Sequence, residues 1–247
     1  MAADLDGRVA FVTGAGQGIG AAIAHDLATL GATVVVADLN AQEANEVAAS
    51  IGSSAVACGC DVTDRVAFTA ALAAIEREHG SIDVLVNNAG ATPHADFLDV
   101  PEDAWTGIVE LNYVAVLTAC KAVLPGMIER GYGRVISIAS DAARIGMPKE
   151  SIYSGAKAAV IAFSKAIAAE VGPKGVTVNV VSPGSTATPL LSSLYTPEQL
   201  EKKGSRNPSG RLAAPQDVAD VVRFFAVGSS YVNGQVLSVN GGALRVG

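Results

Sequence analysis

Short apolar segments alternate with helical segments along the whole chain, and this alternation limits the folds that are open to it. The apolar segments are rich in β-branched residues and carry no polar face, which is typical of strands buried on both sides. Strands are expected at residues 9–12, 33–37, 55–60, 84–87, 134–138, 177–181 and 236–239. Helices are expected between them, at residues 19–30, 41–50, 64–79, 102–130, 152–171 and 215–227. Because strand–helix–strand units cross over in the right-handed sense, the sequence predicts an α/β fold: a Rossmann-like doubly wound parallel sheet of about seven strands, with helices on both faces.

The chain is expected to form one domain over residues 1–247, because no linker, repeat or low-complexity run divides it. One segment, residues 186–211, breaks the alternation. It is polar, carries Pro189, Pro197 and Pro208, and has a helical patch near residues 197–203. Long irregular segments in compact domains often close over a site, so this segment is predicted to be a lid.

Charge and cysteine content limit the classes of binding partner and the cellular compartment that we expect for the chain. The chain has 24 acidic and 17 basic residues and a net charge of -7, which disfavours nucleic acid and anionic membranes as partners. Its cysteines are few and odd in number, which favours a reducing cytoplasm over a disulfide framework, and two of them are expected to pack beside a strand: Cys58 and Cys60. The histidines lack metal-ligand spacing, so no metal site is assigned. We expect no signal peptide and no run of about 18 apolar residues that would span a bilayer.

A glycine-rich turn follows the first expected strand, in the sequence Thr13-Gly14-Ala15-Gly16-Gln17-Gly18-Ile19-Gly20. Glycines let the backbone approach a pyrophosphate closely, and the N-terminus of the following helix offers N–H groups and a positive dipole end. The spacing departs from G-x-G-x-x-G, because Ile19 stands where the third glycine belongs. A plain tight turn therefore remains an alternative, although the position between the first strand and the first helix favours a dinucleotide site.

Polar residues at the ends of the next strands fit the rest of a dinucleotide. Asp38 ends the second strand, where a carboxylate accepts hydrogen bonds from the adenosine ribose and repels a 2′-phosphate; the alternative is a solvated loop residue. Asp61 follows the third strand and could accept from the adenine amino group or cap the next helix. The fourth strand ends in Asn87-Asn88-Ala89-Gly90, which leaves room for a cofactor above it. The expected cofactor is NAD.

Tyr153 and Lys157 are four residues apart on an expected helix and so share a face. A cation within about 4–6 Å favours phenolate and lowers the pKa of a tyrosine from about 10. Such a tyrosine can exchange a proton with an alcohol, although the pair alone also fits an exposed helical face. Ser140 follows the fifth strand and could hold a substrate oxygen, and Asn112 is an amide within an apolar run that needs a partner if buried. The hydroxyl-rich turn at residues 182–188 could bind a nicotinamide carboxamide.

Taken together and in this order, these motifs identify the sequence as a member of the short-chain dehydrogenase/reductase family. The resemblance covers nearly the whole chain and rests on the glycine-rich turn, the Asn87–Gly90 motif, Tyr153-x-x-x-Lys157, and the single residues Asn112, Ser140, Asn179, Pro183 and Gly184. It implies an NAD(H)-dependent oxidoreductase, usually a homotetramer, with a cofactor half at about 1–100 and a catalytic half at about 101–247. It also implies a catalytic tetrad: Asn112, Ser140, Tyr153 and Lys157. Within it, Lys157 would also bind the nicotinamide ribose, and Asn112 would hold a water in a proton relay.

The cofactor-binding residues that follow from the motifs and the resemblance form one longer set. They are Gly14, Gln17, Gly18, Ile19, Asp38, Leu39, Asp61, Val62, Asn88, Ala89, Gly90, Tyr153, Lys157, Pro183, Gly184, Thr186 and Thr188.

The substrate is expected to be a secondary alcohol on a compact apolar skeleton with an acidic or CoA-linked group. Residues 139–144 and 179–186 resemble dehydrogenases of alicyclic acids, such as 2-hydroxycyclohexanecarboxyl-CoA dehydrogenase and 2,3-dihydro-2,3-dihydroxybenzoate dehydrogenase. Asp141 and Arg144 are the candidate substrate residues. Further cations near the expected cleft are Lys149, Lys202, Lys203, Arg206 and Arg211, and the apolar lid residues are Leu190, Leu191, Leu194 and Tyr195. The alternative for the cations is that they are solvated loop charges.

Other functions fit parts of the same pattern. A 3-oxoacyl-[acyl-carrier-protein] reductase-like enzyme shares the general motifs, but Asp38 stands where such an enzyme usually has a basic site for the NADPH phosphate. An epimerase or dehydratase acting through a transient ketone is a related reaction. A catalytically silent NAD-binding sensor or scaffold belongs to another class, because a fold does not fix a function.

Overall fold

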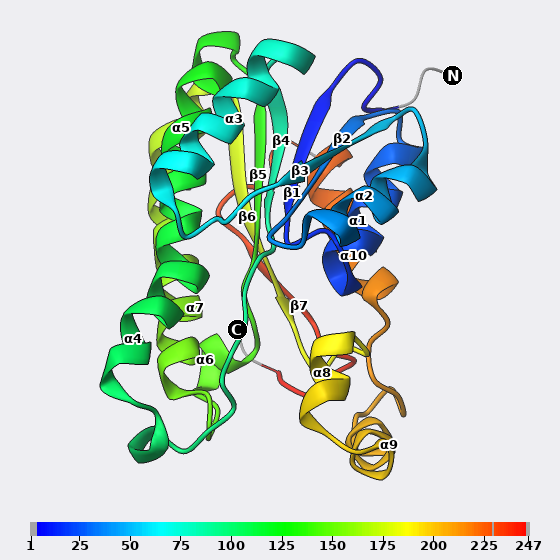
Figure 1. Cartoon of the computed structure of the whole chain (residues 1–247), viewed down its shortest axis with the longest axis vertical. Helices are drawn as coiled ribbons and strands as arrows, with labels where there is room; N and C mark the ends of the chain where they lie inside the picture. The colour runs from blue at the N-terminus through cyan, green and yellow to red at the C-terminus, as the bar shows by residue number, and fades with distance from the viewer. Residues whose placement is uncertain (1–3, 229, 246–247) are drawn as a thin grey trace.

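The computed structural model describes residues 4–228 and 230–245; the remaining positions of the expected 1–247 domain lie outside this range. Its centre is one seven-stranded parallel sheet with the order β3-β2-β1-β4-β5-β6-β7 (Figure 1). The strands are β1 (Val9–Thr13), β2 (Thr33–Asp38), β3 (Ala55–Gly59), β4 (Ile82–Asn87), β5 (Gly133–Ile138), β6 (Val176–Pro183) and β7 (Val236–Val239). The predicted doubly wound α/β fold is confirmed.

The helices form two layers, one on each face of the sheet (Figure 1). One layer holds α1 (Gly18–Thr29), α2 (Ala41–Ile51) and α10 (Pro215–Val227), and the other holds α3 (Arg65–His79), α5 (Ala115–Arg130) and α7 (Ser151–Val171). The shorter elements are α4 (Glu102–Val109), α6 (Ala142–Ile145), α8 (Pro189–Leu194), α9 (Pro197–Ser205), η1 (Phe97–Asp99), η2 (Glu110–Val114) and η3 (Gly172–Lys174). Each face of the sheet therefore has its own apolar core.

The strand order reverses at β1, which pairs with β2 on one side and with β4 on the other. Ligands of open α/β sheets bind outside the carboxyl ends of the strands at such a switch point. Apart from Asn112, which lies between α4 and α5, the polar motifs from the sequence follow the carboxyl end of a strand or begin the next long helix. The fold therefore gathers these motifs at one edge of the sheet.

The expected helix at 102–130 is interrupted. Between α4 and α5 the backbone widens to a π-helical turn at Glu110–Val114, in which Asn112 is fully buried. The Asn112 side-chain amide donates to the Ala91 carbonyl at 2.8 Å and to the Ile108 carbonyl at 2.9 Å. The amide thus competes for a carbonyl of its own helix, and π turns of this kind are frequent at functional sites.

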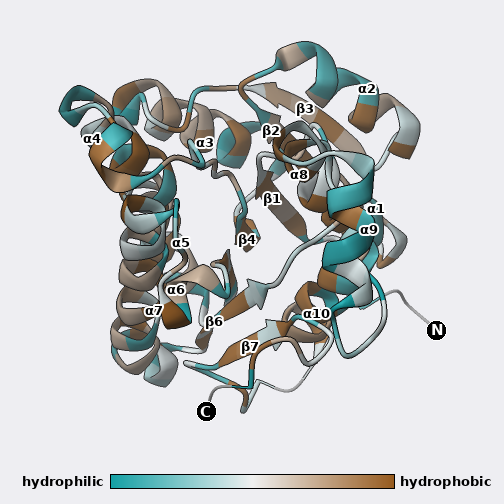
Figure 2. Ribbon diagram, turned by 90° about the horizontal axis from the view of Figure 1, so that it is seen from below, coloured by the Kyte–Doolittle hydropathy of each residue, from teal (hydrophilic) through white to brown (hydrophobic). Residues whose placement is uncertain are grey.

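Two short helices were not expected from the sequence, α6 and α8. The six residues of α8 are too few to show helical periodicity, but Pro189 stands in its first turn and Thr188 accepts a hydrogen bond from Leu191 N at 3.2 Å. The next helix, α9, covers the expected patch and stands out as hydrophilic beside α8 (Figure 2).

Two helical stretches, Glu102–Arg130 and Ser151–Lys174, are long and apolar enough to cross a membrane by length and composition alone. This differs from the expectation that no such run exists. One side of each stretch packs into the apolar core on one face of the sheet. Examples are Ala119 and Val123 of α5 and Val160 of α7. Helices of a packed core commonly have such a composition.

Candidate active site

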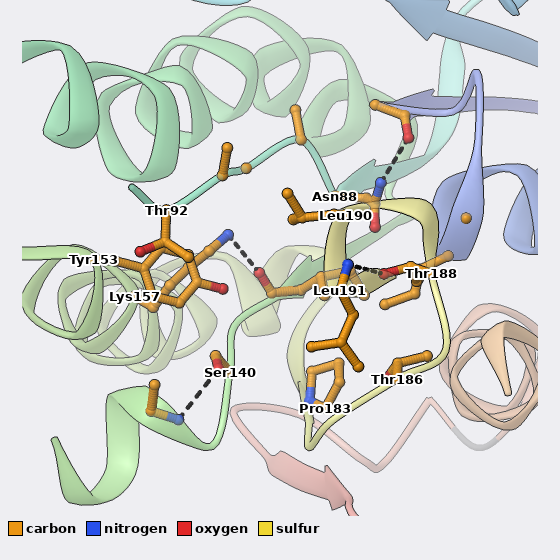
Figure 3. Close-up of a pocket in the computed structure, with 18 of the residues that line it drawn as sticks. Asn88, Thr92, Ser140, Tyr153, Lys157, Pro183, Thr186, Thr188, Leu190 and Leu191 are labelled. Atoms are coloured by element: carbon orange, nitrogen blue, oxygen red, sulfur yellow. Dashed lines mark hydrogen bonds between the residues drawn. The ribbon is translucent and has the colours of Figure 1, made fainter. Parts of the chain in front are cut away.

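A cavity of about 650 Å³ lies at the carboxyl edge of the sheet. Its walls come from the glycine-rich turn, the ends of β2 to β6, the first turns of α7, and the lid helices α8 and α9. All of the predicted cofactor-binding residues line it, and so do Ser140 and Asp141. Figure 3 shows Ser140, Tyr153 and Lys157 together on one side, with Pro183, Thr186 and Thr188 on the other.

The glycine-rich turn packs against the end of β4 so tightly that a side chain would not fit. Gly14 has a φ of +60°, and a Cβ placed on it would lie 2.9 Å from the Ala89 Cα. Gly18 has a φ of +56° and begins α1, so the N–H groups of the first helical turn face the cavity edge. This geometry fits a pyrophosphate, whose charge would meet the positive end of the helix dipole.

The turn is fixed by Thr13, a residue that was not among the predicted site residues. The Thr13 hydroxyl accepts from the backbone N–H groups of Asn88 and Ala89, both at 3.0 Å. In return the Asn88 amide donates to the carbonyls of Thr13 and Gly14, both at 2.9 Å. Asn88 lines the cavity, and its amide connects the end of β4 to the glycine-rich turn. In the sequence, the signal for Thr13 was its position directly before Gly14 in the turn motif, not the spacing of the glycines.

Asp38 lies at the opposite end of the cavity from Tyr153, and its carboxylate is hydrogen-bonded to the glycine-rich turn. Its carboxylate accepts from Gly16 N and from Asn40 N, each at 2.9 Å. Asp61 accepts from the backbone and hydroxyl of Thr63 at 2.8 and 2.7 Å, and these bonds lower the pKa of Asp61. The alternative of a helix cap at Asp61 is wrong, because Asp64 caps α3.

Tyr153 and Lys157 face Ser140 across the start of α7. Lys157 is buried, donates to the Ile138 carbonyl at 2.9 Å, and has its Nζ 5.8 Å from the centroid of the Tyr153 ring. The Ser140 hydroxyl accepts from Ala142 N at 3.1 Å and hydrogen-bonds Tyr153. These three side chains form a group that can hold a carbonyl or hydroxyl oxygen and exchange a proton with it.

The expected lowering of the tyrosine pKa is wrong for the protein without its cofactor. Burial raises the pKa of Tyr153 to about 12, a hydrogen bond from Ser140 opposes the rise, and the Glu150 carboxylate adds to it. Burial also lowers the pKa of Lys157 to about 8. Desolvation outweighs the cation because Lys157 sits beneath the ring rather than at the hydroxyl.

Asn112 lies behind this group rather than on the cavity wall. Among the described residues its Oδ1 has no hydrogen-bond partner, although the atom is buried. A Cβ on Gly90 would lie 2.7 Å from Asn112 Oδ1 and 3.0 Å from Lys157 Nζ. Glycine at position 90 therefore leaves a space in which both polar atoms could reach one small polar molecule.

Of the two predicted substrate residues, Asp141 lines the cavity and Arg144 does not. Asp141 is buried and accepts from Asn240 Nδ2 at 2.6 Å and from the Ser182 hydroxyl at 3.3 Å, so it connects the ends of β5, β6 and β7. The Arg144 guanidinium donates to the Ser238 hydroxyl at 3.1 Å, and Arg144 lies outside the cavity lining. Arg144 therefore does not contribute to the expected cluster of cations around a bound anion.

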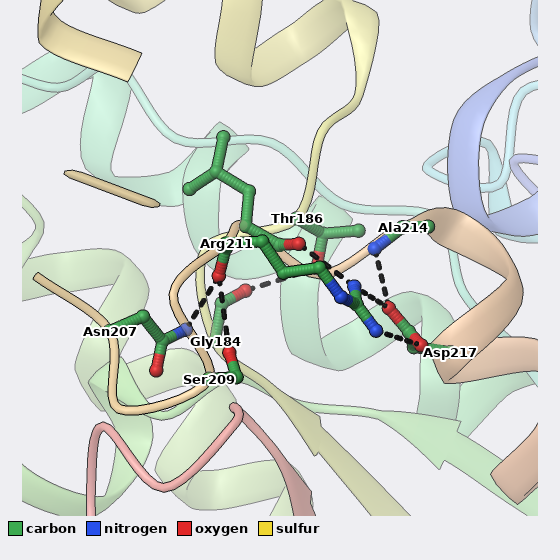
Figure 4. Close-up of polar contacts among 8 residues, drawn as sticks. Gly184, Thr186, Asn207, Ser209, Arg211, Ala214 and Asp217 are labelled. Atoms are coloured by element: carbon green, nitrogen blue, oxygen red, sulfur yellow. Dashed lines mark hydrogen bonds and ion pairs between the residues drawn. The ribbon is translucent and has the colours of Figure 1, made fainter. Parts of the chain in front are cut away.

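Of the further cations near the expected cleft, Lys203 alone among those described lines the cavity. Arg211 pairs with Asp217, with Nη2 and Oδ1 at 2.8 Å, and the same carboxylate accepts from Ala214 N (Figure 4). Lys203 lines the cavity, whereas Lys149, Lys202 and Arg206 do not. The four expected apolar lid residues do line the cavity: Leu190, Leu191, Leu194 and Tyr195.

Three polar residues near Tyr153 were missed by sequence reasoning: Thr92, His94 and Glu150. Their signals were weak, because two of them lie in the irregular stretch after β4 and Glu150 precedes α7. Only their position relative to Tyr153 and the lid reveals them.

A doubly wound sheet with a glycine-rich turn at its switch point, joined to a Ser–Tyr–Lys group at the strand ends, defines the class of dinucleotide-dependent oxidoreductases. Residues 14–243 match a family model described as Enoyl-(Acyl carrier protein) reductase. The 3-oxoacyl-[acyl-carrier-protein] reductase of Vibrio cholerae is 38% identical over 244 residues, which cover 98% of this chain and 100% of the relative. The 7alpha-hydroxysteroid dehydrogenase of Escherichia coli is 38% identical over 245 residues, covering 98% and 96%.

Two solved structures show the same fold. The 3-ketoacyl-(acyl-carrier-protein) reductase from Brucella melitensis complexed with NADH has a TM-score of 0.90 at 31% identity and covers 96% of this chain and 98% of its own. Levodione reductase has a TM-score of 0.92 at 28% identity, with the same coverage. The chain belongs to the short-chain dehydrogenase/reductase family, and it is an oxidoreductase that acts on CH–OH groups.

Proposed function

We propose that the protein is an NAD(H)-dependent reductase that interconverts a ketone and a secondary alcohol, with 3-oxoacyl thioesters as the substrate class. The observation that carries the chemistry is the group of Ser140, Tyr153 and Lys157 at one end of a cavity whose other end holds Asp38. The 3-oxoacyl class rests on the relatives, several of which are 3-oxoacyl-[acyl-carrier-protein] reductases at 36–38% identity.

The bound nicotinamide would supply a hydride to the substrate carbon. The chain itself handles the proton and the oxygen. Ser140 donates a hydrogen bond to the ketone oxygen, and the Tyr153 hydroxyl gives its proton to that oxygen as negative charge develops there. The buried ammonium of Lys157 stabilises the phenolate that remains, and Asn112 and Lys157 together hold the small polar molecule that returns a proton to Tyr153.

Cofactor choice follows from charge. The Asp38 carboxylate stands at the adenosine ribose end, so a 2′-phosphate would meet a like charge, while free ribose hydroxyls would find an acceptor. NADH in the Brucella relative agrees with this preference. The free thiols of Cys58, Cys60 and Cys120 fit a reducing compartment, and we propose a cytoplasmic location.

A substrate whose reacting end is neutral also fits the cavity better than one whose reacting end is anionic. Glu150 lines the wall near Tyr153, and its carboxylate would repel a second carboxylate at that position. Arg144, which was expected to bind an acid, is engaged with Ser238. The cyclic or acidic substrate therefore has less support than a neutral thioester with an apolar chain beneath the lid.

The test is a matched substrate panel with NADH and NADPH, followed by the change in reduced-cofactor absorbance. We expect acetoacetyl-CoA to be reduced with NADH, and a cyclic hydroxy acid to be oxidised poorly with NAD⁺. Turnover of the cyclic acid above the thioester would contradict the substrate class. Tight NADH binding without turnover of any ketone or alcohol would indicate a silent sensor, and product formation without net cofactor change would indicate an epimerase or dehydratase.

A further inference from the structure

His94 lies between the lid and the body of the protein, at the mouth of the cavity. It belongs to the stretch that follows β4, and it is in contact with one residue on each side of the mouth. Its Nδ1 is 3.4 Å from Glu150 Oε1, and its Nε2 is 3.4 Å from the Tyr195 hydroxyl. Glu150 directly precedes α7, whereas Tyr195 joins the lid helices α8 and α9.

The hydrogen bonds on the two ring nitrogens support one another. A carboxylate can only accept, so Glu150 accepts a hydrogen bond from Nδ1–H, and Nε2 is left as an acceptor for a hydroxyl. Burial, together with the Glu150 charge, raises the pKa of Tyr195, which keeps that hydroxyl protonated and able to donate. The result is a chain in which Tyr195 donates to His94 and His94 donates to Glu150.

Ring contacts strengthen the same junction. The rings of His94 and Tyr195 meet edge to face with centroids 5.4 Å apart. Lys203 of α9 also contacts the Tyr195 ring, with its Nζ 4.8 Å from the ring centroid. Both lid helices are thus joined to His94 through one aromatic side chain.

The body side of the junction is held firmly. Lys149 has a φ of +68°, which is uncommon for a residue other than glycine, and its carbonyl accepts from Ala95 N at 3.0 Å. This bond ties the stretch carrying His94 to the one carrying Glu150. A lid contact made to such a fixed base can determine how often the lid opens.

We propose that His94 is a positioning residue that holds the lid closed over the substrate end of the cavity, through the chain Tyr195–His94–Glu150. Opening breaks the Tyr195–His94 bond and leaves the His94–Glu150 pair in place. The residue touches no reacting atom, so it acts on substrate retention and water exclusion rather than on the proton transfer.

Lid opening can be measured without any substrate, because α9 carries trypsin sites at Lys202 and Lys203, with Arg206 just beyond. Native-state cleavage follows the open population when closing is fast. Loss of one such bond should raise the cleavage rate at these sites about three- to tenfold in His94→Ala. Cleavage at exposed Arg77 of α3 serves as the internal reference, and His25→Ala, which removes a surface histidine bonded to Ser50, is the matched control.

Two isosteric replacements of His94, by Asn and by Gln, distinguish the contributions of its two hydrogen bonds. Asn can reproduce the Nδ1 contact to Glu150 and is too short for Tyr195, whereas Gln can reach the position of Nε2. We expect His94→Asn and Tyr195→Phe to behave like His94→Ala, and His94→Gln to restore slow cleavage. The double variant His94→Ala/Tyr195→Phe should be no worse than either single variant, because both remove the same bond.

Activity gives a second, separate readout that rests on the proposed function. We expect KM for acetoacetyl-CoA to rise by a similar factor, with kcat unchanged or higher and the melting temperature unchanged. Unaltered cleavage at the lid sites in His94→Ala would overturn the proposal, and so would equal effects of Asn and Gln or a parallel loss of kcat and melting temperature. The tryptic result does not depend on the substrate, so failure of the thioester assignment and failure of the lid contact are distinguishable.

Discussion

Tyr153 is the residue on which the proposed chemistry depends most. It is half-buried, its pKa is about 12 without cofactor, and Ser140 is hydrogen-bonded to it. A high pKa favours the protonated form that a ketone reduction needs at the start, and the positive charge of an oxidised nicotinamide would lower it for the reverse reaction. The same side chain can therefore serve both directions.

Replacing Tyr153 with Phe removes the hydroxyl that exchanges the proton and keeps the aromatic ring. We expect kcat to fall about 10²–10⁴-fold, the usual contribution of acid–base catalysis. NADH affinity measured by fluorescence titration should stay close to that of the wild type. A Tyr153→Phe enzyme with near-normal turnover would show that another group moves the proton.

Lys157 makes the stability of the protein depend on pH. Its pKa falls from 10.5 to about 8 on burial, so the unfolded chain binds more protons than the folded one between these values. Below about pH 8 the folded protein bears the full free-energy cost of a buried charge on Lys157. This cost is relieved as the pH rises toward 10.5, so the free energy of unfolding increases in this window by up to ~1.4 kcal/mol per pH unit. Above pH 10 the raised pKa of Tyr153 opposes the gain.

Urea unfolding between pH 8 and 10 tests this directly. The increase in unfolding free energy with pH should be smaller in Lys157→Met than in the wild type. Lys165→Met, on the exposed side of the same helix, should keep the wild-type slope. Identical slopes in all three proteins would mean that Lys157 is not buried as a charged group.

Asp38 should set the preference for NADH. We expect kcat/KM for NADH to exceed that for NADPH by at least about tenfold, or ~1.4 kcal/mol, and Asp38→Asn to reduce the ratio. Asn keeps one acceptor for Gly16 N, so the turn should stay in place. Asp61→Asn, in the same cavity, is the control that should leave the ratio unchanged. Equal use of both cofactors by the wild type would refute the assignment.

At the scale of helices and strands, fixed and movable parts of the site are separate. Ser140, Asp38 and Asn88 lie directly at strand ends, where the sheet holds the backbone. The walls that would meet the substrate chain come from α8 and α9, whose described residues are largely exposed. Chemistry should therefore tolerate changes in the lid that alter substrate preference.

Leu191 provides a test of this separation. It lines the cavity from α8, so Leu191→Ala should raise KM more for a longer 3-oxoacyl thioester than for acetoacetyl-CoA, by up to about fourfold for each methylene that loses its contact. Activity with the short substrate should stay near wild type. Ser193→Ala, on the same helix but outside the cavity lining, is the control. Equal changes in KM for both chain lengths would count against a chain beneath the lid.

The sequence predicted the strands to within about two residues because each is apolar on both faces and bounded by polar or glycine residues. All of the residues that it predicted for the cofactor line the cavity, since parallel strands end at one edge. It missed the π turn at Asn112, whose side-chain amide donates both to the Ile108 carbonyl of its own helix and to the Ala91 carbonyl, 21 positions away. The positions of Arg144 and His94 likewise depend on loops, whose paths are set by distant partners such as Ser238 and Tyr195.

At the scale of the whole molecule, the outer face of α7 carries small side chains beside its charged ones, Lys165 and Glu170. The outward side of α7 carries small residues at Gly155, Ala162, Ala166 and Ala169, over a stretch that is also rich in apolar side chains. Small residues let two helices approach closely, and closed symmetric assemblies are the usual way to cover such surfaces. We therefore expect a homotetramer.

Ala162→Glu places a charge on this face without touching the core. We expect the variant to lose the tetramer in light scattering at micromolar concentration while keeping its secondary structure. Ala49→Glu, on the exposed side of α2 over the opposite face of the sheet, is the matched control and should remain tetrameric. A monomeric wild type would contradict the prediction.

The two ends of the segment that forms the lid lie side by side. Thr186 pairs with Ala213 in a parallel bridge, with Ala187 N bonded to the Ala213 carbonyl at 2.8 Å and Ala213 N bonded to the Ser185 carbonyl at 3.1 Å. A segment whose two ends meet can be exchanged for another of different length with little effect on the rest of the chain. Residues 187–212 could therefore be transplanted between relatives as a unit, and a graft from a steroid-acting relative would carry a new substrate range onto an unchanged proton-transfer centre.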